Sequence, residues 1–481
     1  MRSLAAALTL ACAHAQVQTA WLQSDVNTLE LPAPNPAYSA IHIDQAAYYR
    51  IPARVIYRSY PVYAPAREPA GYWEWLASRE PVVAFDSSNI RTLEDWVRAG
   101  EIVFNAPTAF APVFFSAADV RDPGFYARSG MPVASDGTVP FARWIIRKKG
   151  MVELGSMGCN TCHTRVLAGG SVVPGAQGNN PGDREGAMLL AASAKVVGEM
   201  KTLERLRAFA RQFQMPWMPG EANALTDTFI LAEFVKAGEE IPPGVTARAN
   251  TSIILPPQIP DLIGVAERRY LDHTGLVRNR GIADLMRYSS LAQDMFSQDR
   301  YGPLRISANA PSVRYSDDQL YALAQYLHSL RPPKNPHRFD AAAARGRSIF
   351  QRENCGRCHT PPLYTNNRLV PVEGFNPPAG AADVMPERIG VDPRYTLQTH
   401  KSTGYYKVPS LKGVWYRGPF GHNGSAATLE EWLDPSRLKP GYTPTGFKGH
   451  DGNTRSIPGH PFGLGLSVKE RRDVIAFLNT L

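Results

Sequence analysis

Two segments of the chain share a polar start followed by an amphipathic pattern. They cover residues 316–330 and 467–481, and each begins with a Ser that has Gln or Glu three residues later, the capping box that starts helices. In the first segment, apolar side chains recur at positions i, i+3, i+4 and i+7, which places them on one face of a helix. These side chains are Leu320, Leu323, Ala324 and Leu327. The pattern predicts a helix in each segment.

These two segments belong to a longer internal repeat. Residues 100–104 (GEIVF) resemble residues 346–350 (GRSIF), and both predict an opening helix. Further along, residues 260–275 match residues 409–424 at a constant offset of 149 positions. The matched pairs begin with Pro260 and Pro409 and include His273 and His422. Self-similarity at this scale indicates two units of the same kind in tandem.

Smaller elements are predicted around the repeat. Residues 138–154 combine apolar and β-prone side chains and predict a hairpin, and residues 183–213 are expected to be helical. Nearer the start, residues 54–63 partly alternate apolar with polar side chains, which predicts an extended segment along the surface. Trp73 and Trp75 are expected to anchor that segment. The prolines of residues 332–336 separate the two repeats, because proline cannot continue the preceding helix.

Two short runs carry the clearest chemistry. Cys159, Cys162 and His163 form one C-x-x-C-H motif, and Cys355, Cys358 and His359 form a second. This motif attaches c-type haem: the two cysteines bond to one edge of the porphyrin as thioethers, and the adjacent histidine ligates the iron. The sequence therefore predicts two covalently bound haem c groups, with His163 and His359 as proximal ligands.

Other roles for C-x-x-C pairs fit the sequence less well. A zinc ribbon sets its pairs about 15 to 20 residues apart, whereas the two pairs here are separated by 196 positions. A thioredoxin-like redox pair gives no reason for a histidine directly after each motif. The haem interpretation explains both the spacing and the histidines.

The first 15 residues are expected to be a removable leader. Arg2 gives a short positive region, residues 4–11 are apolar, and Ala13 to Ala15 match an A-x-A cleavage site. Cleavage would also remove the fifth cysteine, Cys12, for which a lipoprotein signal is the alternative. Export suits the maturation of c-type haem, so a periplasmic or secreted protein is expected. No other apolar run approaches the ~18 to 20 residues of a membrane span.

Length and charge indicate how many domains the chain can form and which kinds of partner are expected. A chain of 481 residues with 44% hydrophobic content can form two to three domains, each with its own core. The formal net charge of +9 would suit nucleic acid, but Lys and Arg are scattered without a long basic run, so no nucleic-acid partner is expected. A basic surface can also attract an acidic redox partner.

These patterns predict a mainly α fold: two tandem cytochrome c-like domains, with an N-terminal extension and a small β insertion in the first domain. The expected boundaries are residues 1–15 for the leader, 16–90 for the extension, 91–332 for the domain with haem 1 and 336–481 for the domain with haem 2.

The order of motifs resembles the bacterial di-haem cytochrome c peroxidase superfamily. The residues that carry the resemblance are Val408-Pro409-Ser410-Leu411, Gly421 to Ser425 and Thr428-Leu429-Glu430. The superfamily also includes the di-haem enzyme that matures methylamine dehydrogenase and the di-haem rubber oxygenases. The resemblance implies that one haem, with an open iron position, does chemistry while the other relays electrons. It also implies a small redox protein, such as a cytochrome or cupredoxin, or a small oxidant as partner.

The resemblance does not identify the sixth ligand of haem 2, for which the local candidates are histidines. The peroxidases carry a methionine 14 positions after the histidine that matches His422, and here that position is Ser436. His460 is the preferred ligand, because the rubber oxygenases ligate the relay haem with a second histidine late in the chain. His422 ranks second, as a residue more often hydrogen-bonded near a haem edge, and His450 is a further local candidate.

For haem 1 the expectation is an open sixth position. Trp217, which follows His163 by 54 residues, lies where the family places an aromatic residue between the haems, although Trp is also a common core anchor. His273 and the pair Met215 and Met218 are weaker ligand candidates.

Three functions remain open at this stage. A peroxidase needs a carboxylate or Gln over the iron to move a proton, and Glu221 is the preferred candidate ahead of Asp227 and Glu233. An oxygenase would present an apolar pocket, for which Phe209, Phe213 and Phe229 are candidates, although each also suits a helix core. The third function is electron transfer alone, with both irons six-coordinate.

Overall fold

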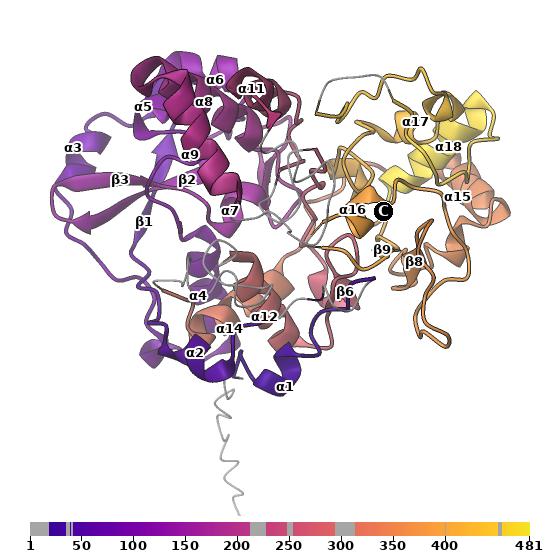
Figure 1. Ribbon diagram of the computed structural model, residues 1–481, viewed down its shortest axis with the longest axis horizontal. Helices are drawn as coiled ribbons and strands as arrows, with labels where there is room; N and C mark the ends of the chain where they lie inside the picture. Colours follow the sequence, from indigo (N-terminus) through magenta and orange to yellow (C-terminus); the bar gives the residue numbers. More distant parts are fainter. Residues whose placement is uncertain are drawn as a thin grey trace, which may run out of the picture.

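The computed structural model describes residues 19–34, 39, 42–211, 228–247, 254–293, 313–399, 401–450 and 455–481. The fold is rich in helices and carries small antiparallel sheets. Figure 1 shows a larger lobe that contains the first motif and a smaller lobe that contains the second. The predicted mainly α class with a small β part agrees with this structure.

The helices of the larger lobe are α1 (Gln23–Val26), α2 (Gln45–Arg50), α3 (Tyr72–Ala77), α4 (Leu93–Asn105), α5 (Ala117–Val120), α6 (Pro123–Ser129), α7 (Cys159–Cys162), α8 (Gly182–Val197), α9 (Glu199–Arg211), α11 (Leu231–Glu239), α12 (Ile282–Gln293) and α14 (Asp317–Ser329). Those of the smaller lobe are α15 (Ala341–Arg352), α16 (Arg394–Leu397), α17 (Leu429–Trp432) and α18 (Val468–Asn479). Short 3-10 turns relevant to the site are η4 (Val265–Glu267), η5 (Cys355–Arg357), η6 (Val414–Tyr416) and η7 (Pro435–Leu438).

The strands form one three-stranded sheet and three two-stranded ribbons. The larger sheet has the order β1 (Ser59–Tyr63), β2 (Thr138–Lys148), β3 (Met151–Gly155), with antiparallel neighbours. The ribbons pair β4 (Thr164–Val166) with β5 (Val172–Pro174), β6 (Tyr270–Leu271) with β7 (Val277–Arg278), and β8 (Leu369–Pro371) with β9 (Tyr405–Lys407). The hairpin predicted over residues 138–154 is therefore present as β2 and β3.

The two predicted closing helices are confirmed, and each crosses its opening helix in the same way. Both α14 and α18 begin with the predicted capping box. Gly100 of α4 packs on the backbone of Ala322, and Gly346 of α15 packs on the backbone of Asp473. Beside each glycine an aromatic pair fills the crossing, Phe104 with Tyr326 at 5.2 Å and Phe350 with Phe477 at 5.4 Å between ring centroids. The internal repeat thus extends from sequence to packing.

Replacing Gly346 by alanine is expected to destabilise the fold by about 3 kcal/mol, the upper range for overpacking a well-packed contact. The added Cβ would overlap the carbonyl oxygen of Asp473, and neither helix backbone can move without opening the aromatic pair. Chemical denaturation of the two proteins measures the difference. The control is Gly465→Ala, where an added Cβ meets nothing within 4 Å. Equal stability of the two variants would show that the crossing is not this close.

The matched middle segments also share local structure. Gly264 and Gly413 adopt the left-handed region, with φ of 75° and 74°, and each precedes a 3-10 turn, η4 or η6. A side chain would be strained at both positions, which explains why the repeat keeps glycine there. The two segments therefore turn alike after Pro260 and Pro409.

The hairpin supports the first motif. Asn160 and Thr161, inside the C-x-x-C sequence, donate hydrogen bonds from their side chains to the carbonyls of Pro140 and Phe141, at 2.7 and 2.9 Å. Both carbonyls belong to β2, and both motif residues are buried. The β insertion thus fixes α7 against the sheet, and it is part of what positions the first motif.

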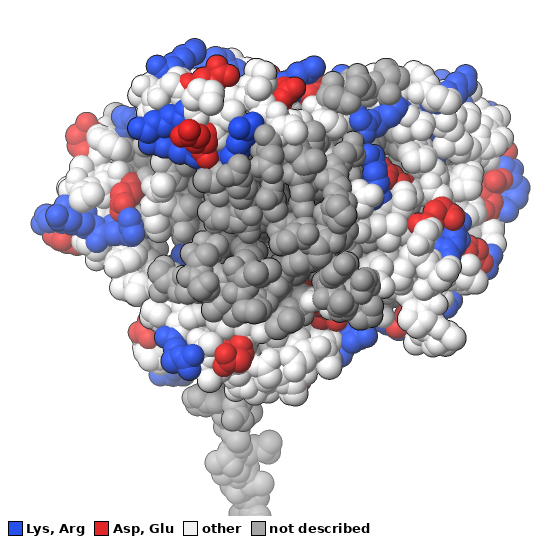
Figure 2. Space-filling view, in the orientation of Figure 1, with Lys and Arg blue, Asp and Glu red and all other residues white. Residues whose placement is uncertain are grey.

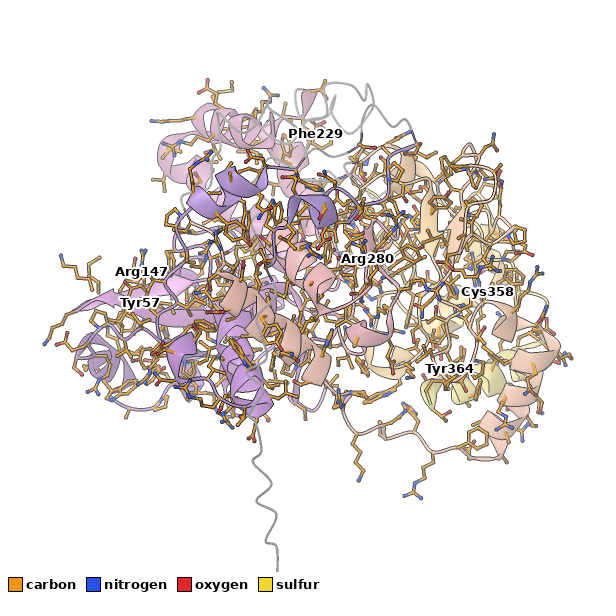
Figure 3. All side chains as sticks on the ribbon, turned by 90° about the horizontal axis from the view of Figure 1, so that it is seen from below. Tyr57, Arg147, Phe229, Arg280, Cys358 and Tyr364 are labelled. Atoms are coloured by element: carbon orange, nitrogen blue, oxygen red, sulfur yellow. The ribbon has the colours of Figure 1, made fainter. Side chains whose placement is uncertain are left out.

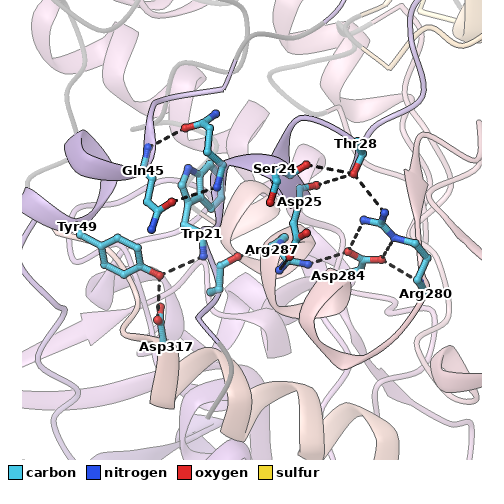
Figure 4. A network of polar contacts seen from close by, with 12 residues as sticks. Trp21, Ser24, Asp25, Thr28, Gln45, Tyr49, Arg280, Asp284, Arg287 and Asp317 are labelled. Carbon is cyan, nitrogen blue, oxygen red and sulfur yellow. Dashed lines mark hydrogen bonds and ion pairs between the residues drawn. The ribbon is translucent and has the colours of Figure 1, made fainter. Parts of the chain in front are cut away.

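The N-terminal extension docks more deeply than its sequence predicts. Trp21 is fully buried, and its ring stacks on that of Tyr48 at 4.4 Å. Polar contacts hold the same segment to α12 and α14, with Arg287 bonded to the Ala20 carbonyl at 2.7 Å and Tyr49 bonded to Asp317 at 2.9 Å (Figure 4). Trp21 is thus a further anchor of the extension. Of the two expected anchors, Trp75 is 42% exposed but its ring contacts that of Tyr60 at 5.4 Å, and Trp73 packs on Trp144 at 5.2 Å.

Two further expectations are adjusted by the structure. Residues 59–63 do not merely run along the surface, because β1 pairs with β2 and Val62 is fully buried. The helical region from residue 183 divides into α8 and α9 at Gly198, whose φ of 91° breaks the helix.

A buried polar network joins the two lobes. Gln258 of the first repeat donates to the carbonyl of Pro419 at 2.7 Å, and Gln177 donates to the same oxygen at 3.1 Å. Arg165, two residues after the first motif, donates to the carbonyl of Gly418 at 3.0 Å. The second lobe is therefore tied to the chain immediately after the first motif.

Candidate haem-binding sites

The second motif opens into the main described cavity. Cys355 and Cys358 lie in and directly after η5, and both line a cavity of about 340 Å³ together with His359. This volume is in the range of ligand sites. The walls around the motif are apolar, made of side chains from the α15 and α18 pair and the loops that follow it: Phe350, Val414, Leu433, Leu466, Val474 and Leu478. Figure 3 shows Cys358 and Tyr364 on the side of this lobe, away from Tyr57 and Arg147.

Hydrogen bonds orient His359. Its Nδ1 atom lies 3.1 Å from the carbonyl oxygen of Pro409 and 3.3 Å from that of Tyr364. Two carbonyl acceptors assign the ring proton to Nδ1, so that the lone pair of Nε2 is available to a metal. Burial lowers the pKa of His359, which also favours the neutral ring.

The first motif repeats this arrangement. His163 directly follows α7, and its Nδ1 atom lies 3.0 Å from the carbonyl oxygen of Pro260. Pro260 and Pro409 are partners in the internal repeat, so both motif histidines use the same backbone acceptor. A backbone carbonyl behind a ligand histidine fixes its tautomer and raises its basicity. The described residues thus present two equivalent C-x-x-C-H sites.

His460 faces His359 in the cavity. The centroids of the two imidazole rings are 6.4 Å apart, and the ring planes make an angle of 53°. A metal between two imidazoles requires about 6.2 Å between ring centroids, since each metal–nitrogen bond is about 2.0 Å and each nitrogen lies about 1.1 Å from its ring centroid. Neither ring nitrogen of His460 forms a hydrogen bond with a described residue, and Nδ1 is buried. Among the described histidines this pair best fits the axial positions of an iron.

The loop that carries His460 is held in an unusual conformation. His460 has a φ of 47°, in the left-handed region that costs a non-glycine residue of order 1 kcal/mol. The fully buried Arg437 offsets this cost by donating to the carbonyls of Gly459 and His460, at 3.0 and 2.9 Å. Burial, together with the nearby His359 and Arg437, lowers the pKa of His460 to about 3. The ring is therefore neutral and able to act as a ligand.

His422 and His273 occupy another part of the same cavity. The ring of His422 stacks on that of Tyr406 at 4.6 Å, and Nε2 of His273 lies 2.7 Å from the carbonyl of Gln258. Burial lowers the pKa of both histidines to about 4, so both are neutral. His422 has an aromatic partner rather than a facing motif histidine, which agrees with its second rank among the predicted ligands.

Several predicted site residues lie outside the described residues. These are Trp217, Glu221, Asp227, Met215, Met218 and Phe213. Glu233 caps α11, accepting from the backbone N–H of Ile230 at 2.9 Å, and Phe229 packs on Phe234 at 5.1 Å in a small core. Those two contacts are structural. Ser436 is the second residue of η7, which begins at Pro435, and its backbone N–H donates to the capping Asp434 at 2.8 Å; that turn contains no methionine.

The sequence interpretation missed two groups of buried charges. Arg268, Lys407 and Arg417 line the cavity that contains His359. Arg268 and Arg417 stand at the repeat offset, so a longer comparison of the two repeats would have found them. The second group is Asp183 and Glu185 in the first turn of α8, where burial raises their pKa values to about 7 and about 8. No local pattern distinguishes these carboxylates from an ordinary acidic helix start.

In the described part of the chain, no group of three or more His, Cys, Asp or Glu side chains could hold a metal ion. None of the described helices is long and apolar enough to cross a membrane.

Comparisons with known proteins give distant similarity. The chain matches no protein-family model. It is 28% identical to cytochrome-c peroxidase IdrP1 of Denitromonas iodatirespirans over 162 residues, 29% of this chain and 40% of that protein. The protein of the same name from Pseudomonas sp. (strain SCT) is 27% identical over 164 residues, 30% of this chain and 40% of that protein. The aligned region thus spans well under two thirds of these relatives.

A solved structure of hydrazine synthase from Kuenenia stuttgartiensis, pressurised with xenon, aligns with 58% of this chain and 87% of its own at 18% identity. Its TM-score of 0.30 is too low to indicate a shared fold. The sequence relatives support a distant link to cytochrome c peroxidases and, in general terms, a haem-dependent oxidoreductase.

Proposed function

We propose that the chain is an exported di-haem c-type cytochrome of the peroxidase kind, with one cytochrome c-like domain over residues 91–332 and a second over residues 336–481. Cys159 and Cys162 attach haem 1, with His163 as its proximal ligand. Cys355 and Cys358 attach haem 2, which is held between His359 and His460. When bound, haem 1 would supply an iron for the reaction with peroxide, and haem 2 would supply an iron that passes on electrons from a small redox protein.

The observation that carries this proposal is the repeated hydrogen bond behind the two motif histidines. His163 and His359 each donate from Nδ1 to the carbonyl of the matching proline, Pro260 or Pro409. A pair of redox-active cysteines gives no reason for this second contact. A metal-ligating histidine does, because the contact sets the direction of the Nε2 lone pair and keeps it unprotonated. The C-x-x-C-H spacing of both motifs supports haem iron as that metal.

The side chains around the second motif suit a haem in shape and polarity. Its apolar walls exclude water, and His359 and His460 leave a gap that matches an iron with two axial imidazoles. When bound, the haems supply iron that exchanges single electrons. Bis-histidine ligation leaves no position for a substrate and gives a lower potential than His/Met ligation, which suits a relay. We include Trp217 and Glu221 in this proposal as the residues that would act over haem 1.

The charge pattern of the described surface supports a protein partner. On the face shown in Figure 2, the coloured Lys and Arg residues are interspersed with Asp and Glu. Such a surface suits a transient partner of moderate charge more than a polyanion.

Intact mass and electron paramagnetic resonance test the proposal. Protein made in a host competent for c-type maturation is expected to carry the mass of two haems, and Cys355→Ala with Cys358→Ala should leave one. The matched double variant at Cys159 and Cys162 should leave the other. The oxidised wild type should then show one high-spin and one low-spin ferric signal. A colourless protein would overturn the haem assignment, whereas two low-spin signals would reduce the function to electron transfer.

A further inference from the structure

One end of the cavity beside the second motif carries three cations. Arg268 follows η4 in the first repeat, Lys407 ends β9, and Arg417 follows η6 in the second repeat. All three line the cavity, which otherwise has apolar walls around the motif. The cavity is thus amphipathic, with its basic end turned toward the junction of the two lobes, where Pro260 and Gln258 also line it.

The cations have few charged partners. The guanidinium of Arg268 donates to the carbonyls of Asp261 and Ile263, the latter at 2.7 Å. Within the described ranges, the Nζ atom of Lys407 bonds only the carbonyl of Tyr270, at 3.5 Å. Arg417 donates to the Ser410 carbonyl at 2.8 Å, lies 3.9 Å from the Asp261 carboxylate, and leaves Nε buried without a partner.

Counting the neighbouring charges shows an excess of positive charge. The buried carboxylates at this end are Asp261, which accepts from Tyr416 at 2.9 Å, and Asp272, which is already paired with Lys401. Lys401 joins the three cations, so four cations face two carboxylates.

His273 and His422 are neutral because burial lowers their pKa values. The other charged wall residues are Arg357, which pairs with Glu387, and Glu353, which pairs with Arg352. With Lys407 protonated, two positive charges remain uncompensated.

Uncompensated charge on partly buried side chains that line a cavity is costly and calls for an anion. Burial, with Arg268 as the next cause, lowers the pKa of Lys407 to about 7, and burial also lowers the pKa of Arg268. Both shifts have the direction expected where a cation lacks its counter-ion. An anion with two negative charges would complete this end of the cavity.

We propose that Arg268, Lys407 and Arg417 form the binding site for the two propionates of the haem attached at Cys355 and Cys358. This inference rests on the proposed function. A haem is apolar over most of its ring and carries two carboxylates on one edge, which matches the apolar walls and the excess of two charges. Because Arg268 belongs to the first repeat, both lobes hold the second haem. Its acidic edge would face Pro260, whose carbonyl accepts from His163.

The test uses the reduction potential of the low-spin haem in the full-length protein. A cation beside the ring stabilises the added electron, so Lys407→Met is expected to make this haem harder to reduce. At the potential where half of the wild-type low-spin haem is reduced, the ratio of reduced to oxidised haem in Lys407→Met should be at least threefold lower. Lys407→Arg keeps the charge and should retain the wild-type ratio. Lys412→Met is the matched control, because Lys412 is 45% exposed and pairs with Glu267 at 3.1 Å outside the cavity.

The outcomes separate the possibilities. A Lys407→Met protein that carries both haems and titrates like Lys412→Met overturns the propionate site while leaving the haems in place. Loss of the second haem in Lys407→Met but not in Lys407→Arg supports the site, and loss in both overturns it. A shift caused by added inorganic phosphate, absent in Lys407→Met, would assign the cations to a free anion and also overturn it. A wild type without tetrapyrrole mass instead overturns the proposed function itself.

Discussion

Replacing His460 by alanine is expected to abolish the low-spin ferric signal of the second haem while both haems stay attached. The ring of His460 faces His359 at 6.4 Å, and its nitrogens have no protein partner among the described residues. Its removal leaves the iron with one strong protein ligand, and a ferric haem with a single imidazole is commonly high-spin. Electron paramagnetic resonance of the oxidised protein measures the change, and intact mass checks that attachment is unaffected.

The matched control for this experiment is His422→Ala. His422 lines the same cavity, but its ring stacks on Tyr406. We expect this variant to retain the low-spin signal. The reverse result, with the signal lost in His422→Ala and kept in His460→Ala, would assign the sixth ligand to His422. His460→Met adds a further check, because His/Met ligation should keep the iron low-spin and raise its potential.

Local signals explain why much of the fold could be predicted. The capping boxes of α14 and α18 and the apolar spacing within them depend on residues three or four positions apart, so sequence alone is enough to find the helices. The hairpin of β2 and β3 is also a local structure. Repetition added long-range information, because it related Pro260 to Pro409 before either was known to contact a motif histidine.

The features that could not be predicted depend on tertiary contacts. Trp21 resembles any aromatic residue near a chain end, and only its packing on Tyr48 makes it an anchor. Lys407 stands in a short strand, and its burial beside Arg268 arises from the meeting of two lobes. His460 was preferred because of the resemblance to the rubber oxygenases, but its position opposite His359 depends on the loop that Arg437 holds.

The acidic first turn of α8 is another feature that could not be predicted from sequence, and it leads to a prediction about stability. Glu185 is 1% exposed, and neither of its carboxyl oxygens has a hydrogen-bond partner among the described residues. Burial, with the charges of Asp119 and Asp183, raises its pKa from 4.5 to about 8. The folded protein therefore keeps this carboxyl protonated at pH values where the unfolded chain ionises it.

This raised pKa gives a defined dependence of stability on pH. The contribution of Glu185 is fully present below pH 4.5 and is lost as the pH rises through about 8. The full loss is about 5 kcal/mol, because each pH unit across the shift corresponds to about 1.4 kcal/mol. Glu185→Gln cannot ionise, so it should resemble the wild type near pH 4.5 and be more stable than it by about 5 kcal/mol near pH 9.

Chemical denaturation at several pH values measures this difference. Comparing the two proteins at each pH cancels the contribution of Asp183, whose raised pKa affects both. The control is Glu94→Gln, because the Glu94 side chain is 81% exposed and should change stability by less than about 0.5 kcal/mol at any pH. A Glu185→Gln difference that stays constant from pH 4.5 to 9 would mean that Glu185 already ionises in the folded protein. A difference that grows with pH would show that α8 begins on a carboxyl group held neutral by burial.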